Sequence, residues 1–169
     1  MFRFLFALAF AFGLASSAHA QSSHLWNDGA GSGQCLDIVN DGANDKLTVV
    51  PCGDYSGQAW TLLAAATPGH VKLQTDFTGG GRCLDVVNDG VNDQVRMASC
   101  GNFTGQEWEV SRRHGPGRTF QLTNRFTGPL RCLAATGEGL RLRSCDGSPA
   151  QQWSGEWPLF GLNGGGAAS

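Results

Sequence analysis

The sequence predicts an all-β protein built from three similar parts. Two closely similar stretches, CLDIVNDGANDKLTVVPCGDYSGQAW at 35–60 and CLDVVNDGVNDQVRMASCGNFTGQEW at 83–108, precede a shortened third copy, CLAATGEGLRLRSCDGSPAQQW at 132–153. The first cysteines of the copies lie 48 and 49 residues apart, and a leucine stands ten residues before each of them. A stretch that recurs three times at this spacing indicates three structural units of about 48 residues each.

Each unit is predicted to hold four short strands. Apolar and polar residues alternate in CLDIV, KLTVV and QVRMA, and the Asn-Asp-Gly clusters between such runs are typical of turns. Three units of four strands can close a barrel that leaves no sheet edge exposed. The expected fold class is therefore a single β-trefoil domain at 21–160 with pseudo-threefold symmetry. Its repeats are predicted at about 21–68, 69–117 and 118–160.

The first twenty residues have the pattern of a secretory signal peptide. Arg3 precedes an apolar run at 4–15, and the small-x-small triplet at 18–20 predicts cleavage near Ala20. This run is shorter than the roughly 20 apolar residues that span a bilayer, and no later segment is longer. We therefore expect a mature chain without a membrane span, secreted to the extracellular space or the periplasm, with a flexible tail at 161–169.

Six cysteines in an exported chain indicate disulfide bonds, for which fifteen pairings exist. Each copy has one cysteine at its start and one before its Gln-x-Trp, so the repeats favour pairing within copies. The predicted bonds are Cys35–Cys52, Cys83–Cys100 and Cys132–Cys145. Zinc binding is the alternative, but the chain has no Cys-x-x-Cys motif and its mature histidines stand alone. We expect no metal and no cofactor.

The combination of Cys-Leu-Asp, a second cysteine and Gln-x-Trp, in register with the leading leucines, resembles the ricin-B-type β-trefoil lectins and carbohydrate-binding modules. The resemblance covers residues 25 to about 157. It implies the trefoil fold and sugar binding, in which the aspartate after Cys-Leu accepts hydrogen bonds from sugar hydroxyls. That aspartate is Asp37 in the first copy and Asp85 in the second, whereas the third copy has Ala134. On residue chemistry alone, the two aspartates could equally brace the Asn-Asp-Gly turns.

The chain departs from the usual pattern of sugar-binding members of this family. Val50 and Ala98 stand where an aromatic platform is usual, and Gly57 and Gly105 stand where asparagine usually precedes the glutamine. These departures argue against ordinary galactose recognition.

Further residues of the first two copies are candidates for sugar contacts. Tyr55 and Phe103, three residues after the second cysteines, either replace the missing platform or pack beneath their own loops. The other candidates carry side-chain amides: Gln58, Gln106, Asn44 and Asn92. The glutamines are expected to be mainly structural, the asparagines are also explained by hairpin geometry, and the three motif tryptophans are expected in the core.

Charge is divided unevenly along the mature chain. Residues 21–111 include eleven acidic and four basic side chains, whereas 112–169 include seven basic and three acidic ones. The later basic residues are Arg112, Arg113, Arg118, Arg125, Arg131, Arg141 and Arg143. Because arginine suits sulfate, phosphate and carboxylate, this lobe is predicted either to hold an anionic partner or to pair with the acidic lobes. Export and the slightly acidic whole argue against nucleic acid.

No motif of a nucleophile beside a base and no metalloprotease motif occurs, so we expect no enzyme activity. The acidic residues that could serve a glycosidase recur in both of the first two copies, which is typical of binding sites rather than of a catalytic centre. The expected function is a secreted lectin with one site in each of these copies. Its expected partners are glycans or glycoconjugates, together with a separate enzyme or toxin chain. The alternative is a protein-binding β-trefoil, such as a protease inhibitor or a toxin-delivery subunit, that acts through its loops or its arginine-rich lobe.

Overall fold

The computed structural model describes residues 22–112 and 119–156, which form twelve β-strands and four short 3-10 helices. Repeat 1 holds β1 (Trp26–Asn27), β2 (Gln34–Ile38), β3 (Leu47–Pro51) and β4 (Trp60–Ala64). Repeat 2 holds β5 (His70–Thr75), β6 (Arg82–Val86), β7 (Val95–Ser99) and β8 (Trp108–Arg112). Repeat 3 holds β9 (Phe120–Asn124), β10 (Gly128–Thr136), β11 (Gly139–Ser144) and β12 (Trp153–Ser154). The predicted signal peptide with its cleavage site at Ala20, the tail at 161–169, Arg113 and Arg118 lie outside the described residues.

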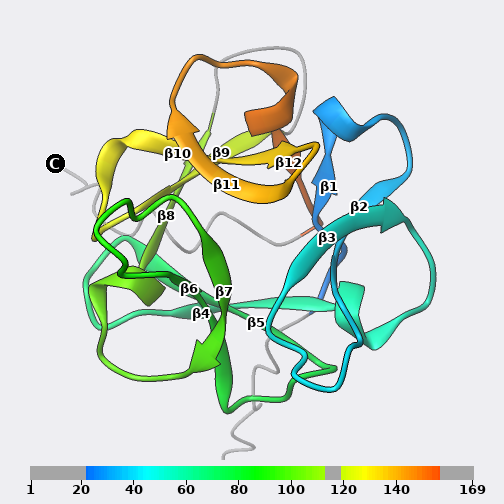
Figure 1. The fold of residues 1–169 in the computed structure, drawn as a ribbon, viewed down its shortest axis with the longest axis horizontal. Coiled ribbons are helices and arrows are strands. Elements are labelled where there is room, and N and C mark those ends of the chain that lie inside the picture. Colours follow the sequence, from blue (N-terminus) through cyan, green and yellow to red (C-terminus); the bar gives the residue numbers. More distant parts are fainter. Residues whose placement is uncertain (1–21, 113–118, 157–169) are drawn as a thin grey trace, which may run out of the picture.

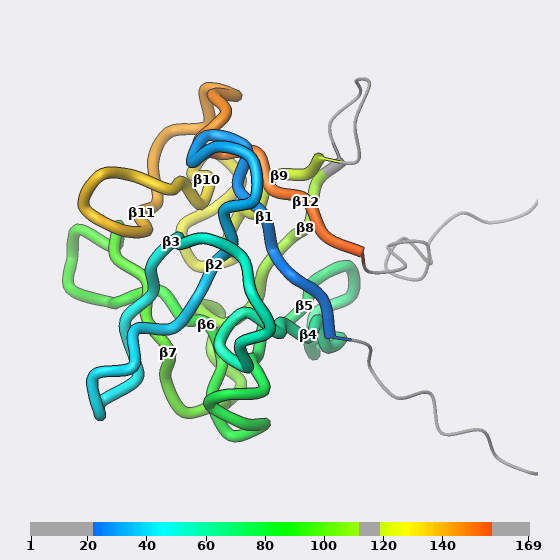
Figure 2. The backbone as a smooth tube through the Cα atoms, turned by 90° about the vertical axis from the view of Figure 1, so that its right-hand side faces the viewer, coloured from blue at the N-terminus to red at the C-terminus, as the bar shows by residue number. Residues whose placement is uncertain are grey.

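Six strands, two from each repeat, form a closed barrel. Antiparallel pairs join β1 to β12, β12 to β9, β9 to β8, β8 to β5 and β5 to β4. Ser23, which precedes β1, pairs with Trp60 of β4 and closes the ring. The other six strands form the hairpins β2–β3, β6–β7 and β10–β11, which lie together on one side of the molecule (Figure 2). Three lobes surround a common centre (Figure 1), which confirms the predicted β-trefoil.

The core is built from residues that hold the same place in each repeat. The leading leucines and the motif tryptophans are fully buried: Leu25, Leu73, Leu122, Trp60, Trp108 and Trp153. Each indole Nε1 donates a 2.9 Å hydrogen bond to the carbonyl oxygen of the leucine after the first cysteine of its repeat. This bond meets the need of a buried indole for a partner and ties each hairpin to the barrel. The predicted core role of the three tryptophans is confirmed.

The three predicted disulfide bonds are present. Cys35–Cys52, Cys83–Cys100 and Cys132–Cys145 join residues whose Cα atoms lie 5.0–5.1 Å apart. Each bond closes a loop within one repeat, and in the chain-entropy model a loop of this length contributes about 3 kcal/mol. Because every cysteine is bonded in this way, no thiolate remains as a zinc ligand.

Arginines of repeat 3 hold its hairpin against the hairpin of repeat 2. Arg131 Nη1 donates to the carbonyl oxygens of Val91 at 3.1 Å and of Asn92 at 3.4 Å. Arg143 forms an ion pair of 3.0 Å with Asp93. These contacts support pairing between the basic and acidic lobes, which is one of the two explanations offered for the division of charge.

Glu107, just before β8, forms a further contact between repeats. Its side chain is buried, and its Oε2 accepts hydrogen bonds from Thr67 Oγ1 at 2.8 Å and from Arg125 Nη1 at 2.7 Å. Burial alone would raise the pKa of Glu107, but the hydrogen bonds from Thr67 and Arg125 and the charge of Arg125 outweigh burial and lower it. The charged form of Glu107 is therefore the one that the fold stabilises.

Replacing Glu107 with glutamine is expected to lower the free energy of unfolding at pH 7 by about 1.5–3 kcal/mol, the range for hydrogen bonds to a charged group. Because the folded state lowers this pKa, the stabilisation is present above the unfolded value and is lost as pH falls through the folded one. Denaturant unfolding from pH 7 to pH 3 should therefore show parent and variant converging below about pH 4. Glu109→Gln, an exposed change two residues further along the chain, should have little effect. If the difference in unfolding free energy between parent and Glu107→Gln stays constant down to pH 3, this account of Glu107 is wrong.

Candidate functional site

The motif glutamines anchor the loop that follows each second cysteine. Gln58 Oε1 accepts from the Gly53 N–H at 2.9 Å, and its Nε2 donates to the carbonyl oxygen of Pro51 at 3.2 Å. The glutamines of the other two repeats make the same pair of bonds to their own loops. Gln58 and Gln106 are fully buried. The structure therefore gives both a structural role and leaves their side chains no surface to offer a sugar.

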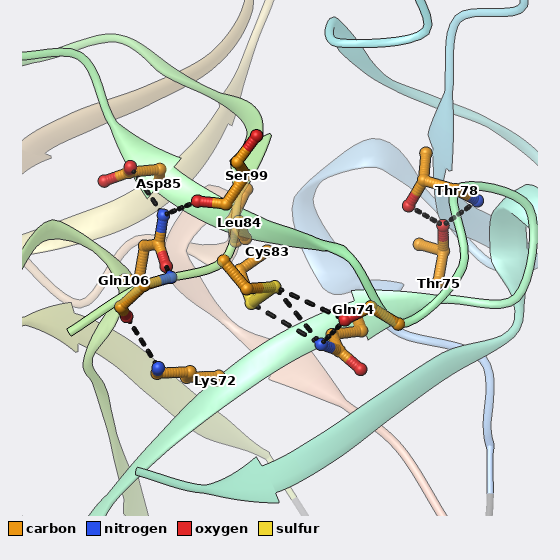
Figure 3. The surroundings of a disulfide bond; sticks show 12 residues. Lys72, Gln74, Thr75, Thr78, Cys83, Leu84, Asp85, Ser99 and Gln106 are labelled. Atoms are coloured by element: carbon orange, nitrogen blue, oxygen red, sulfur yellow. Dashed lines mark hydrogen bonds between the residues drawn. A yellow bond between two sulfur atoms is a disulfide. The ribbon is translucent and has the colours of Figure 1, made fainter. Parts of the chain in front are cut away.

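In repeats 1 and 2 the same amide also fixes a carboxylate. Gln58 Nε2 donates to Asp37 Oδ2 at 2.9 Å, and Gln106 Nε2 donates to Asp85 Oδ2 at 2.9 Å. Figure 3 shows Asp85, Gln106 and Ser99 in this arrangement. In repeat 1, Asp37 Oδ1 accepts from the Ile38 N–H at 2.7 Å. Each aspartate lies near the end of the first strand of its hairpin, is held there by a buried glutamine, and is only half-buried.

The turns of the hairpins are braced by other residues. In repeat 1 the N–H groups of residues 42–44 donate to Asp41 and Asn44, and in repeat 2 the N–H groups of residues 89–92 donate to Asp89 and Asn92. Asn44 and Asn92 have positive φ angles of 53° and 56°, which asparagine tolerates better than most residues. Asp37 and Asp85 are thus not the residues that brace these turns, and the two candidate asparagines use their side-chain oxygens within them.

Glycine before each glutamine is explained by the aspartate. A Cβ atom on Gly57 would overlap Asp37 Oδ1, and a Cβ atom on Gly105 would overlap Asp85 Oδ1. The carboxylate therefore lies directly against the glycine. In repeat 3 the two positions are Ala134 and Ala150, so the repeat without the carboxylate is also the one that carries a Cβ atom there.

The two loop aromatics are exposed above their own loops. Tyr55 and Phe103 are 64% and 61% exposed, and one side of each ring lies close to Gly53 or Gly101. Each ring packs against its own loop and also presents apolar surface to the solvent, and the role of the two rings as a sugar platform stays a prediction.

In repeat 1, the aspartate, the loop aromatic and the glycine line one hollow of about 350 Å³. Its lining includes Asp37, Asn40, Asp54, Tyr55, Gly57 and Phe77. Phe77 belongs to repeat 2, and its N–H donates to the carbonyl oxygen of Ser56 at 3.2 Å. Neither Asn40 nor Phe77 was predicted from the sequence. The signal for Phe77 is the shared Phe-Thr-Gly at 77–79 and 126–128, four residues after the leading leucine.

Repeat 2 has a carboxylate and two aromatic rings at the equivalent sequence positions, and repeat 3 does not. Asp85, Phe103 and Phe126 correspond to Asp37, Tyr55 and Phe77, and Phe126 is 38% exposed. The equivalents in repeat 3 are Ala134, Ser148 and Gly29. Repeat 3 therefore lacks the carboxylate and both aromatic rings.

Within the described residues, no three His, Cys, Asp or Glu side chains gather closely enough to hold a metal ion. In the same part of the chain, no helix has the length and apolar character needed to cross a membrane.

Residues 23–153 match the family model of the ricin-type β-trefoil lectin domain. The fold is similar to the designed threefold-symmetric protein ThreeFoil, with 24% identity, a TM-score of 0.67, and coverage of 79% of this chain and 96% of that one. The fold is also similar to that of the Macrolepiota procera ricin B-like lectin, which was solved in complex with lactose. The identity is 18%, the TM-score is 0.64, and the match covers 85% of this chain and 100% of the lectin. The exo-β-1,3-galactanase 1,3Gal43A from Clostridium thermocellum also matches, with 21% identity, a TM-score of 0.62, and coverage of 82% of this chain but 30% of the enzyme. No curated protein sequence matches the chain. The chain belongs to the ricin-type β-trefoil lectin domain family.

Proposed function

We propose that this protein is an exported, non-catalytic lectin with two glycan sites, one in repeat 1 and one in repeat 2. The observation that carries the proposal is a fixed carboxylate, Asp37, in one hollow with the exposed ring of Tyr55 and the partly buried ring of Phe77. The recurrence of these residue types around Asp85 supports a second site. A sugar as the partner is further supported by the Macrolepiota procera lectin of similar fold, which was solved in complex with lactose.

The chemistry of this arrangement suits a sugar. A carboxylate accepts strong hydrogen bonds from hydroxyl groups, which contribute about 1.5–3 kcal/mol each. Aromatic rings beside it bury the apolar C–H face of a sugar ring. The hollow of about 350 Å³ in repeat 1 lies at the small end of the usual range of ligand sites, about 300–1,000 Å³.

The glutamines act in this proposal as positioning residues. Gln58 and Gln106 are fully buried and fix the carboxylates through their Nε2 hydrogen bonds. Gly57 and Gly105 leave the space that the carboxylates occupy, because they have no Cβ atom. The direct contacts are assigned to Asp37 and Asp85, to the two loop aromatics, and to Phe77 and Phe126 from the following repeats. Asn44 and Asn92 are assigned a structural role in the hairpin turns and no sugar contact.

Two sites on one rigid body also account for the duplication. A single shallow site binds a sugar weakly, whereas two sites that engage one surface raise the effective concentration of the second binding event. We therefore propose glycan-bearing surfaces, rather than free sugars, as the partner. The signal peptide predicted to end near Ala20 and the three disulfide bonds support export to an oxidising compartment.

The test uses Asp37→Asn and Asp85→Asn, singly and together. Asparagine keeps the size of aspartate and one oxygen for the glutamine, but loses the charge and one acceptor. On a glycan array, each single variant should still bind the glycan of the parent, and the double variant should lose binding by at least tenfold. Glycan-coated beads should be cross-linked by the parent but by none of these three variants, because cross-linking needs two sites.

The matched control is Asp41→Asn, which makes the same charge change in an exposed turn of repeat 1. It should bind and cross-link as the parent does. A double variant that binds like the parent would show that the sites lie elsewhere. A parent that binds no glycan would reject the lectin and favour a protein-binding β-trefoil.

A further inference from the structure

The residues around the two proposed sites differ in charge. In the loop after the second cysteine, Asp54 of repeat 1 corresponds to Asn102 of repeat 2. Just before the phenylalanine that the following repeat contributes, Asp76 at the first site corresponds to Arg125 at the second. The backbones match: the Asp76 N–H donates to residue 59 and the Arg125 N–H donates to residue 107, at 3.1 and 2.9 Å. These two positions are thus both acidic at the first site, whereas at the second site one is neutral and the other is basic.

Repeat 1 surrounds its site with negative charge. Asp54 lines the hollow of about 350 Å³ together with Asp37. A second hollow, also about 350 Å³, shares Asp54 and Tyr55 with the first, and its lining includes the exposed Glu156. Asp76 is exposed, and its N–H donates to the carbonyl oxygen of Ala59, which lines this second hollow. Acidic residues therefore line both of the hollows that share Tyr55.

Repeat 2 has two cations, Lys72 and Arg125, among the residues near its proposed site. Lys72 Nζ donates to the carbonyl oxygen of Gly101 at 2.6 Å, in the loop that carries Phe103 (Figure 3). Arg125 is 46% exposed and offsets the charge of the buried Glu107, to which it is bonded. Arg125 is thus paired with Glu107, and Lys72 is bonded to the same loop whose Gly101 N–H is held by Gln106, the partner of Asp85, so two cations accompany the two carboxylates of this repeat.

We infer that the two sites select glycans by charge: the repeat-1 site takes uncharged glycans and excludes acidic ones, whereas the repeat-2 site accepts sialylated or sulfated glycans. This inference rests on the proposed function. An acidic group in the repeat-1 hollow would lie within about one Debye length, 8–10 Å near physiological ionic strength, of several carboxylates. In a water-like dielectric, each like charge at about 8 Å from the acidic group weakens its binding roughly twofold. About three such charges together therefore weaken binding about tenfold. The chain would then cross-link two different kinds of glycan on one surface.

The test separates the sites with the single variants already described. Asp85→Asn leaves the repeat-1 site, and Asp37→Asn leaves the repeat-2 site. Each variant is displayed as a tetramer on an array that presents neutral glycan cores beside their sialylated and sulfated forms. At low salt, the repeat-1 site should prefer the neutral core by about tenfold, and the repeat-2 site should bind both forms within about threefold. The preference should shrink as salt is added.

A charge exchange assigns the effect to particular residues. Asp54→Asn with Asp76→Arg, added to the Asp85→Asn variant, should remove the preference for neutral cores. Asp28→Asn with Glu138→Arg, two exposed positions that line neither hollow, is the control and should leave it. Equal selectivity at the two sites, or a preference that survives the exchange, would overturn the inference while the lectin function stands. If neither single-site variant binds any glycan, the proposed function fails and this inference fails with it.

Discussion

Replacing Trp60 with alanine is expected to lower the free energy of unfolding by about 3–5 kcal/mol, the range for large buried aromatic residues. The ring is fully buried and its Nε1 donates to the carbonyl oxygen of Leu36 at 2.9 Å. The loss is a large part of the roughly 5–15 kcal/mol that stabilises a typical domain. Denaturant unfolding of the disulfide-bonded protein measures it, and Trp108→Ala should lose a similar amount because its surroundings repeat those of Trp60.

Two further variants separate the contributions of the ring and its hydrogen bond. Trp60→Phe keeps most of the apolar area but leaves the Leu36 carbonyl without its donor, so we expect a loss of about 1–3 kcal/mol. Trp26→Ala, at a half-buried position on β1, is the control and should cost about 1 kcal/mol. If Trp60→Ala were no more harmful than Trp26→Ala, the core assigned to the motif tryptophans would be wrong.

The fold could be predicted from the sequence because its determinants repeat. The leading leucines and the motif tryptophans recur three times at constant spacing, and all six are fully buried. The cysteines recur in the same register, so the periodicity singled out one pairing among fifteen and the structure contains it. Strand alternation and turn residues were enough for the hairpins, because both depend on local chemistry.

The candidate site was only partly predictable, because a trefoil site draws on two repeats. Asp37 and Tyr55 lie in the same copy of the repeated stretch, but Phe77 comes from the next repeat, and only the barrel brings it to the Ser56 loop. Asn40 and Asn44 are alike in a turn sequence, and only their backbone geometry separates the one that lines the hollow from the one that braces the turn. The glycines before the glutamines depart from the family pattern, and only their contacts with the aspartates explain them.

Gly57→Ala is expected to abolish glycan binding in repeat 1 and to destabilise the protein by about 1–3 kcal/mol. The new Cβ atom would overlap Asp37 Oδ1, so the carboxylate would have to leave its hydrogen bond from Gln58. Binding is measured in the Asp85→Asn background, where only the repeat-1 site is left. Gly137→Ala is the control, because a Cβ atom there meets nothing within 4 Å, and it should change neither binding nor stability.

A double-mutant cycle tests whether the overlap with Asp37 is the cause. In Asp37→Ala with Gly57→Ala the clash is gone, so the double variant should be no less stable than Asp37→Ala alone, although it still binds no glycan in repeat 1. The cycle would then show a coupling of about 1–3 kcal/mol, as expected of residues in direct contact. Additive losses would mean that Gly57 serves the backbone rather than the carboxylate.

Repeat 3 already contains the product of this double change, since Ala134 and Ala150 stand where Asp37 and Gly57 stand in repeat 1. The same reasoning predicts that Ala134→Asp alone is destabilising there, because the Ala150 Cβ atom occupies the space that the carboxylate needs. Adding Ala150→Gly should restore stability, because it frees that space and lets Gln151 donate to the new aspartate as Gln58 does to Asp37. If both forms are equally stable, an aspartate in this fold does not need the glycine, and the pairing of the two residues in repeats 1 and 2 has another cause.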